Sequence, residues 1–362
     1  MRVIRPFGLR DAWAIKHLQP RGVAFGLRRL LGSSSPVSSA VLGLLTRRLL
    51  GALTLVYYGP KRSNVRGFAQ LEPRRDGQAW DLTFLAPSLD ERQALPCIWQ
   101  DLLAYAVVAA AQQQALRLYA RPPQDSEIEQ LLRRAGFALV TREEVFALSE
   151  PPPPAALPRG FREADRQDAW ALSELYRKAI PPLAYQAQGP VQLGSLGLSS
   201  GLGSRPAGYV WTEKGEIVAH LTLSALPRGY WIECAVHADY RGELLPYIAY
   251  LISLTDCSPS RPAYLAVPDY NVGLGWLLRT LGFVSYSRQL VMVAHTANRV
   301  SVARPIAASS RESTVDMATP VSAPRGVGGG RGQGDSSRGH LKAMSPGVVF
   351  AALTPTRENT NR

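Results

Sequence analysis

The sequence is short of cysteine and lysine, and it has no long apolar run. Its three cysteines, Cys97, Cys234 and Cys257, lack the spacing of a disulfide framework or a metal site, so we expect reduced thiols, no metal and a cytoplasmic location. The longest apolar run, Leu102 to Ala111, has about ten residues, too few to cross a bilayer. Residues 1–19 contain no continuous apolar segment of the kind found in signal peptides.

The charge is strongly basic, at +13, yet only 5 of the 41 basic residues are lysine. An arginine bias of this kind points to a GC-rich genome more than to a nucleic-acid surface. A basic chain favours acidic partners, but no DNA- or RNA-binding motif is present. We therefore expect neither a specific nucleic acid nor a membrane as partner, and we keep nucleic-acid association only as a third hypothesis.

Two stretches with the same order of features flank a proline-rich segment. Residues 150–158 contain four consecutive prolines and form a stiff linker. The motif Asp-Ala-Trp-Ala at residues 11–14 recurs at 168–171, and Leu-Leu-Arg-Arg-Ala-Gly-Phe at 131–137 resembles residues 277–283. Between these anchors, Trp80 corresponds to Trp231. Three anchors in a preserved order predict two copies of one α/β unit.

Local patterns predict the elements of each copy. In the first copy, residues 53–58, 65–71 and 79–86 have the composition of successive strands. In the second copy, a strand is expected at residues 230–236, followed by a polar turn and apolar residues at helical spacing. We predict that this helix begins near Arg241. A strand that leads into a helix N-terminus is typical of an anion site.

The turn after residues 230–236 resembles the first motif of the GNAT acetyltransferases. In that family a Val-x-Pro-x-Tyr-Arg-Gly-x-Gly-x-Gly pattern leaves the fourth strand and cradles the pyrophosphate of acetyl-CoA. Here Val236, Tyr240, Arg241 and Gly242 match, and a leucine and a proline stand where two glycines are usual. Asn271, before the second-copy Gly-Phe, resembles the start of the family's second motif.

The resemblance covers residues 1–298 and implies an α/β (α+β) fold. We expect two tandem GNAT-like domains, each a mixed, mostly antiparallel twisted sheet flanked by helices. The first domain is placed at residues 1–149, the linker at 150–158 and the second domain at 159–298. Residues 299–362 are dominated by Gly, Ser, Pro and Arg, and we expect them to form a disordered tail.

The resemblance also implies a site in the second copy, where the fourth and fifth strands diverge and acetyl-CoA binds as acyl donor. The implied cofactor-binding residues are Ala235, Val236, Arg241, Gly242, Glu243, Leu244, Leu245 and Asn271. Pro246 has no N–H to give, and the side chain of Leu244 is expected to crowd the phosphates. Asn271 is equally a candidate N-cap of the helix that follows it.

The resemblance makes Glu233 the candidate general base, because the family often places a glutamate at this point of the fourth strand. A carboxylate in an otherwise apolar strand is also unusual. The alternative is a salt bridge to an arginine at the rim, and the sequence leaves both open. The family's usual tyrosine acid is replaced by Leu278. Tyr270, Tyr286 and Tyr247 are nearby in sequence and could substitute for it, and we take Tyr270 as the candidate. A nucleophilic Cys234 is disfavoured, because no histidine is placed in sequence to activate it.

The first copy is expected to be inert, because its turn at residues 86–92 lacks glycine and contains Asp90 and Glu91 where pyrophosphate would lie. It would then act as a scaffold or as a wall of the acceptor site. The resemblance implies an acetyl-CoA-dependent N-acyltransferase acting on a small-molecule or peptide amine. The alternative is an inactive tandem GNAT-like binding or scaffold protein. The oligomeric state stays open, and a monomer is compatible with the sequence.

Overall fold

The computed structural model describes residues 3–32, 35–45, 52–59, 65–74, 78–89, 96–189 and 206–296. Contacts divide the chain into two units, residues 1–304 and 305–362, and every described residue belongs to the first. The expected tail at residues 299–362 and the acidic pair Asp90 and Glu91 lie outside the described residues.

The described elements of the two copies follow a common order, to which the first copy adds β2 and one more helix before β3. Those of the first copy are β1 (Val3–Pro6), α1 (Ala12–Leu18), β2 (Val23–Ala24), α2 (Leu27–Leu31), α3 (Pro36–Leu45), β3 (Leu53–Tyr58), β4 (Val65–Pro73), β5 (Ala79–Ala86), α4 (Pro96–Gln112), β6 (Arg117–Ala120), α5 (Ser126–Arg134) and β7 (Ala138–Leu148). Those of the second are β8 (Phe161–Glu163), α6 (Ala169–Ala179), α7 (Pro182–Gln188), β9 (Ala207–Glu213), β10 (Glu216–Leu226), β11 (Gly229–Val236), α8 (Leu245–Ser253), β12 (Ala263–Pro268), α9 (Leu274–Thr280) and β13 (Val284–His295). The strands predicted in both copies are confirmed, and so is the mixed α/β class.

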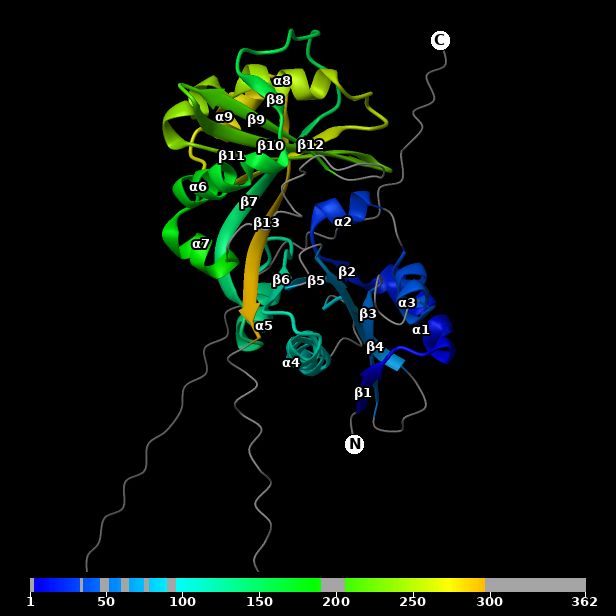
Figure 1. The fold of residues 1–362 in the computed structure, drawn as a ribbon. Coiled ribbons are helices and arrows are strands. Elements are labelled where there is room, and N and C mark those ends of the chain that lie inside the picture. The colour runs from blue at the N-terminus through cyan, green and yellow to red at the C-terminus, as the bar shows by residue number, and fades with distance from the viewer. Residues whose placement is uncertain are drawn as a thin grey trace, which may run out of the picture. The chain divides into compact units, whose positions relative to one another are not determined.

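The described strands join one 13-stranded sheet in the order β1-β3-β4-β5-β6-β13-β7-β12-β11-β10-β9-β8, with β2 beside β5. The last strands of the two copies are exchanged. β13, from the second copy, pairs with β6, and β7, from the first copy, pairs with β12. The two exchanged strands also pair with each other, antiparallel, from Val284–Ala147 to Val293–Ala138 (Figure 1). The copies therefore share a continuous sheet, which the sequence did not predict.

Each copy has a core on the face covered by its crossover helices. In the first copy, α4 and α5 pack over alternate residues of β3, β5, β6 and β13, with Trp99 fully buried among them. In the second copy, α8 and α9 pack over β7, β10, β11 and β12, around Ile232 and Leu265. On the opposite face, α1 and α3 cover the first copy and α6 covers the second.

One anchor of the internal repeat, the match of Trp80 with Trp231, is wrong, because the two side chains lie on opposite faces of the sheet. Trp80 packs in the core beneath α4 and α5, whereas Trp231 lies on the face opposite α8 and α9, against Leu31 of α2. Because successive strand residues point to opposite faces, matching the two tryptophans shifts the alignment by an odd number of residues. The strand pairing instead aligns Leu82 with Ile232, the last residue of each copy that pairs with the next parallel strand.

Candidate functional site

The two parallel strands of the second copy diverge, as the resemblance predicted. β11 pairs with β12 only at Tyr230–Ala263, Trp231–Tyr264 and Ile232–Leu265. β11 then continues to Val236, and β12 continues along β7 to Pro268. Among the described strands, none pairs with the β12-facing edge of β11 after Ile232. The backbone groups along this edge are therefore open to an extended, polar ligand.

The same gap in the first copy is filled by the chain itself. β5 pairs with β6 as far as Leu82, and beyond this point β2 takes the vacated edge, with Val23 opposite Leu85 and Ala24 opposite Phe84. This must be the β6 side, because β4 pairs with the other edge of β5 along its length. Phe25 N–H also donates to the Thr83 carbonyl at 2.9 Å. The first copy has a wedge of the same kind, but it is closed.

The turn after β11 differs from the prediction in where the helix begins. Residues Ala238–Glu243 form a 3-10 helix, and α8 starts at Leu245 instead of near Arg241. The reason is Pro246, which lacks an N–H and is tolerated only in the first helical turn. The Leu244 side chain is fully buried in the core beneath α8, so the expected crowding of this turn by Leu244 is wrong.

Arg241 is the residue of this turn best suited to an anion. Its Nε is buried and has no hydrogen-bond partner among the described residues. Its positive charge acts on Cys234 of β11 and on Tyr270 after β12, opposing the rise of both pKa values, so it lies near the open side of the wedge. A guanidinium with an unused N–H is suited to an anionic oxygen such as that of a phosphate.

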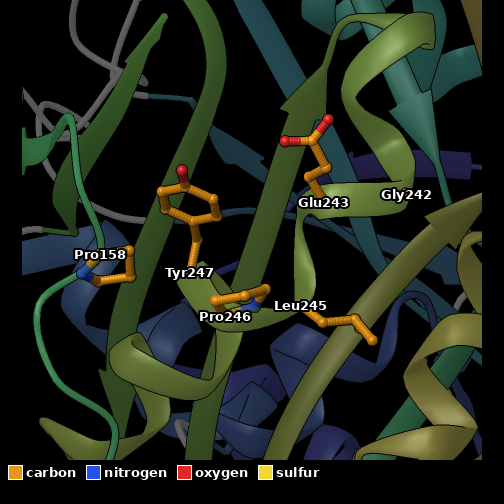
Figure 2. A pocket seen from close by; sticks show the side chains of 6 residues that line it. All are labelled: Pro158, Gly242, Glu243, Leu245, Pro246 and Tyr247. Carbon is orange, nitrogen blue, oxygen red and sulfur yellow. The ribbon is translucent and has the colours of Figure 1, made fainter.

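A surface pocket of about 510 Å³ lies beside the N-terminus of α8 (Figure 2). Its lining residues are Pro158, Gly242, Glu243, Leu245, Pro246 and Tyr247. Tyr247 stacks on Trp211 of β9 at 4.2 Å and donates a hydrogen bond to the Arg159 carbonyl at 3.3 Å. The pocket therefore extends toward the β8–β9 side of α8, and three of the predicted cofactor residues, Gly242, Glu243 and Leu245, line it.

Glu233 stands at the apex of the wedge, one residue beyond the last β11–β12 pair. It accepts a 2.8 Å hydrogen bond from Arg28 of α2 and a 3.1 Å bond from the Trp231 indole. Partial burial by itself would raise the pKa of Glu233, but the charges of Arg28 and Arg121, with the Trp231 hydrogen bond, hold it below its ordinary value. The arginine salt bridge weighed as an alternative is thus present, and the base role stays a prediction.

The other predicted residues lie around the wedge. Ala235 and Val236 are buried on β11, and Asn271 is buried after β12. Asn271 is not the N-cap of α9; that position is Gly273, in a left-handed conformation with φ 87°. Burial and the nearby Glu143 raise the pKa of Tyr270, so its hydroxyl stays protonated.

Cys234 is held as a neutral thiol. Burial and the nearby Glu233 charge raise its pKa to about 12. A thiol of this kind is a poor nucleophile at neutral pH.

Two residues of the second copy were missed. The Tyr176 hydroxyl of α6 lies 3.0 Å from Nδ1 of His220, which is fully buried on β10 opposite Ala235. Burial, then the charge of Glu233, raise the pKa of Tyr176. The signal was a histidine within the apolar strand at residues 216–226, facing α6 instead of the α8 core.

The described residues contain neither a metal-ligand cluster nor a membrane-spanning helix. No group of three or more His, Cys, Asp or Glu side chains could hold a metal ion there. Within the same residues, no helix is both long and apolar enough to cross a membrane.

Comparison with known proteins finds similarity in fold. No family model and no curated protein matches the sequence. A solved GCN5-related N-acetyltransferase from Sphaerobacter thermophilus is 17% identical, covers 82% of this chain and 96% of its own, and has a TM-score of 0.47. A tandem GNAT protein from the clavulanic acid biosynthesis pathway is 16% identical, with 82% of this chain and 99% of that chain covered and a TM-score of 0.46. An acetyltransferase of the GNAT family from Colwellia psychrerythraea is 13% identical, with 81% of this chain and 99% of that chain covered and a TM-score of 0.40. These similarities concern the fold alone.

Proposed function

We propose that the chain is an acetyl-CoA-dependent N-acyltransferase with its site in the second copy. The observation that carries this proposal is the open edge of β11 from Glu233 to Val236, beside Arg241 and its unused Nε–H. The pantetheine arm of acetyl-CoA is an extended chain with amide groups, which suits an unpaired strand edge. The filled wedge of the first copy supports a single site per chain.

The residues around the wedge supply the remaining functions. When bound, acetyl-CoA supplies an activated thioester carbonyl. Arg241 pairs with a phosphate, and the backbone of residues 233–236 orients the arm. Glu233 accepts the proton that the acceptor amine loses as the C–N bond forms and the C–S bond breaks. The neutral hydroxyl of Tyr270 or Tyr176 gives a proton to the departing sulfur and is reprotonated from solvent.

The second candidate is a tandem binding or scaffold protein without turnover. The ion pair between Glu233 and Arg28 favours it, because a carboxylate with a lowered pKa is a weak base. Leu278, fully buried in the core beneath α9, stands where the family usually has its tyrosine acid. This candidate retains acetyl-CoA binding and loses only the transfer.

Calorimetry of acetyl-CoA binding to the full chain tests the proposal. We expect binding by wild type and at least a hundredfold weaker binding by Arg241→Glu, since a cation in contact with pyrophosphate becomes an anion. Arg133→Glu, at an exposed arginine of α5, is the matched control and should bind as wild type. The proposal is rejected if titration of acetyl-CoA into the wild-type chain gives no heat of binding. Binding without transfer to any amine of a broad panel selects the scaffold candidate.

A further inference from the structure

The first copy contributes a charged residue to the wedge of the second. α2 lies against the β11 face opposite α8, where Leu27 and Leu31 pack with Trp231 and Tyr264. The Arg228 N–H also donates to the Leu31 carbonyl at 3.3 Å, which fixes the end of α2 on the β10–β11 turn. α2 thus holds Arg28 next to the apex of the wedge.

The ion pair between Arg28 and Glu233 is accessible and anchored at both ends. Their side chains are 44% and 46% exposed, so a small ligand can reach both. Arg28 also donates to the Ser224 hydroxyl at 3.3 Å, and Glu233 accepts from the Trp231 indole at 3.1 Å. Each side chain therefore keeps a partner if the pair opens, which lowers the cost of inserting a ligand between them.

The surrounding charge selects the kind of ligand. Glu233 lies in the field of three guanidinium groups, those of Arg28, Arg121 and Arg74. Arg74 and Arg121 also pair with Asp81, whereas Arg28 pairs with Glu233 itself, so a ligand amine that takes Glu233 leaves Arg28 without its carboxylate. A ligand that also carries a carboxylate can pair that group with Arg28, in place of the Glu233 carboxylate that the arginine loses when the ligand enters.

The closed copy has no carboxylate at the matching point. Thr83 occupies the apex of the first wedge, one residue beyond Leu82, and it carries no charge. The apex residue of the closed wedge therefore cannot form a pair like that of Glu233 with Arg28.

We infer that the acceptor is an amino acid: its amine is held by Glu233 and its carboxylate by Arg28. This inference rests on the proposed function, because it places the acceptor at the apex of the acetyl-CoA wedge. Transfer would join the acetyl carbon to the amino nitrogen, with the amine proton passing to Glu233 and the thiol released. Arg28 acts here as a specificity residue that binds substrate and takes no part in proton transfer.

The test compares each of the twenty amino acids with its decarboxylated amine and with a dipeptide in which the amine is far from the carboxylate. Thiol release from acetyl-CoA by the full chain is the readout. We expect at least one amino acid to exceed its amine and its dipeptide tenfold or more in kcat/KM. Arg28→Gln should lower kcat/KM for that amino acid at least tenfold, mainly through KM, and leave acetyl-CoA binding unchanged. Arg133→Gln, which also removes an exposed arginine with one carboxylate partner, should change neither.

Thermal unfolding in the presence of CoA and the same acceptors provides a binding readout that needs no turnover. Stabilisation by an amino acid that is lost in Arg28→Gln supports the inference. The inference is overturned if amines or dipeptides give the same kcat/KM and stabilisation as the amino acids. It is also overturned if Arg28→Gln lowers these values equally for all three kinds of acceptor. The acetyl-CoA proposal stands in either case. A chain that binds no acetyl-CoA overturns both.

Discussion

Asp11 and Asp168 make the same contacts at the same point of the two copies. Each is buried at the start of the first long helix and accepts a 2.9 Å hydrogen bond from the backbone N–H three residues earlier. Each also pairs with the arginine six residues earlier, Arg5 at 3.0 Å and Arg162 at 2.7 Å. The aspartate of the repeated Asp-Ala-Trp-Ala motif thus fixes the strand-to-helix turn in both copies.

Asp168→Asn should lower the free energy of unfolding by about 2 kcal/mol, because it removes hydrogen bonds between charged groups. The hydrogen bonds from Arg162 hold the pKa of Asp168 below its ordinary value. The stability they contribute is therefore present above the ordinary aspartate pKa and is lost as the pH falls through the lowered value. Urea unfolding at pH 7 and pH 3 measures this, and the difference between wild type and variant should shrink at pH 3. Asp256→Asn, at a 92% exposed side chain, is the control and should cost under about 0.5 kcal/mol.

Acetyl-CoA should bind with a stoichiometry of one per chain, because β2 fills the first wedge. A Cβ at Gly22 would lie 2.2 Å from the Phe84 ring and 2.9 Å from the Leu85 carbonyl, so the fit of this segment depends on glycine. Gly22→Val should lower the unfolding free energy by more than about 1 kcal/mol and leave acetyl-CoA affinity unchanged. Calorimetry gives both stoichiometry and affinity. Two bound molecules per wild-type chain would contradict the closed first wedge.

Glu233→Gln should lower kcat by about a hundredfold, the low end for loss of a general base. The charges of Arg28 and Arg121 overcome the effect of burial and hold the Glu233 pKa below its ordinary value, so the carboxylate is ionised throughout the usual assay range. The acid limb of kcat/KM should therefore follow the pKa of the acceptor amine. A limb that stays fixed when amines of different pKa are compared would contradict this assignment.

Tyr176→Phe should lower kcat about tenfold and cost about 1 kcal/mol of stability, through loss of the hydrogen bond to His220. Because burial raises the Tyr176 pKa above its ordinary value, the hydroxyl stays protonated up to at least pH 10. The wild-type pH–rate profile should accordingly show no alkaline loss from this residue. Tyr105→Phe, on α4 of the first copy, is the control for a tyrosine far from the wedge. Equal kcat in wild type and Tyr176→Phe would leave Tyr176 a purely structural role.

The strands and the wedge were predictable because they depend on local patterns. Aromatic and β-branched runs marked β3, β4, β5 and β11, and the order of elements implied the divergence of β11 from β12. The start of α8 was displaced by a single proline. The Trp80–Trp231 match failed because residue identity alone does not report which face of a strand is buried.

The features that were missed depend on contacts between distant parts of the chain. β2 has two residues, too few for any periodic pattern, and its role comes from pairing with β5. The exchange of β7 and β13 was missed for the same reason, because either strand offers apolar residues to its neighbours. Phe146 of β7 pairs with Leu265 of β12, and Met292 of β13 pairs with Ala120 of β6. The link from Arg28 to Glu233 joins two copies that the sequence presents as separate.

The exchange of the last strands has a consequence for synthesis on the ribosome. β6 borders β13, so the first copy keeps an incomplete edge until Val284–His295 has been translated. The first copy therefore cannot complete its sheet until the second has emerged, and it stays exposed to proteases and chaperones for longer than an independent domain would. Genetic separation of the copies would remove a strand from each, so we expect the duplication to be inherited as a whole.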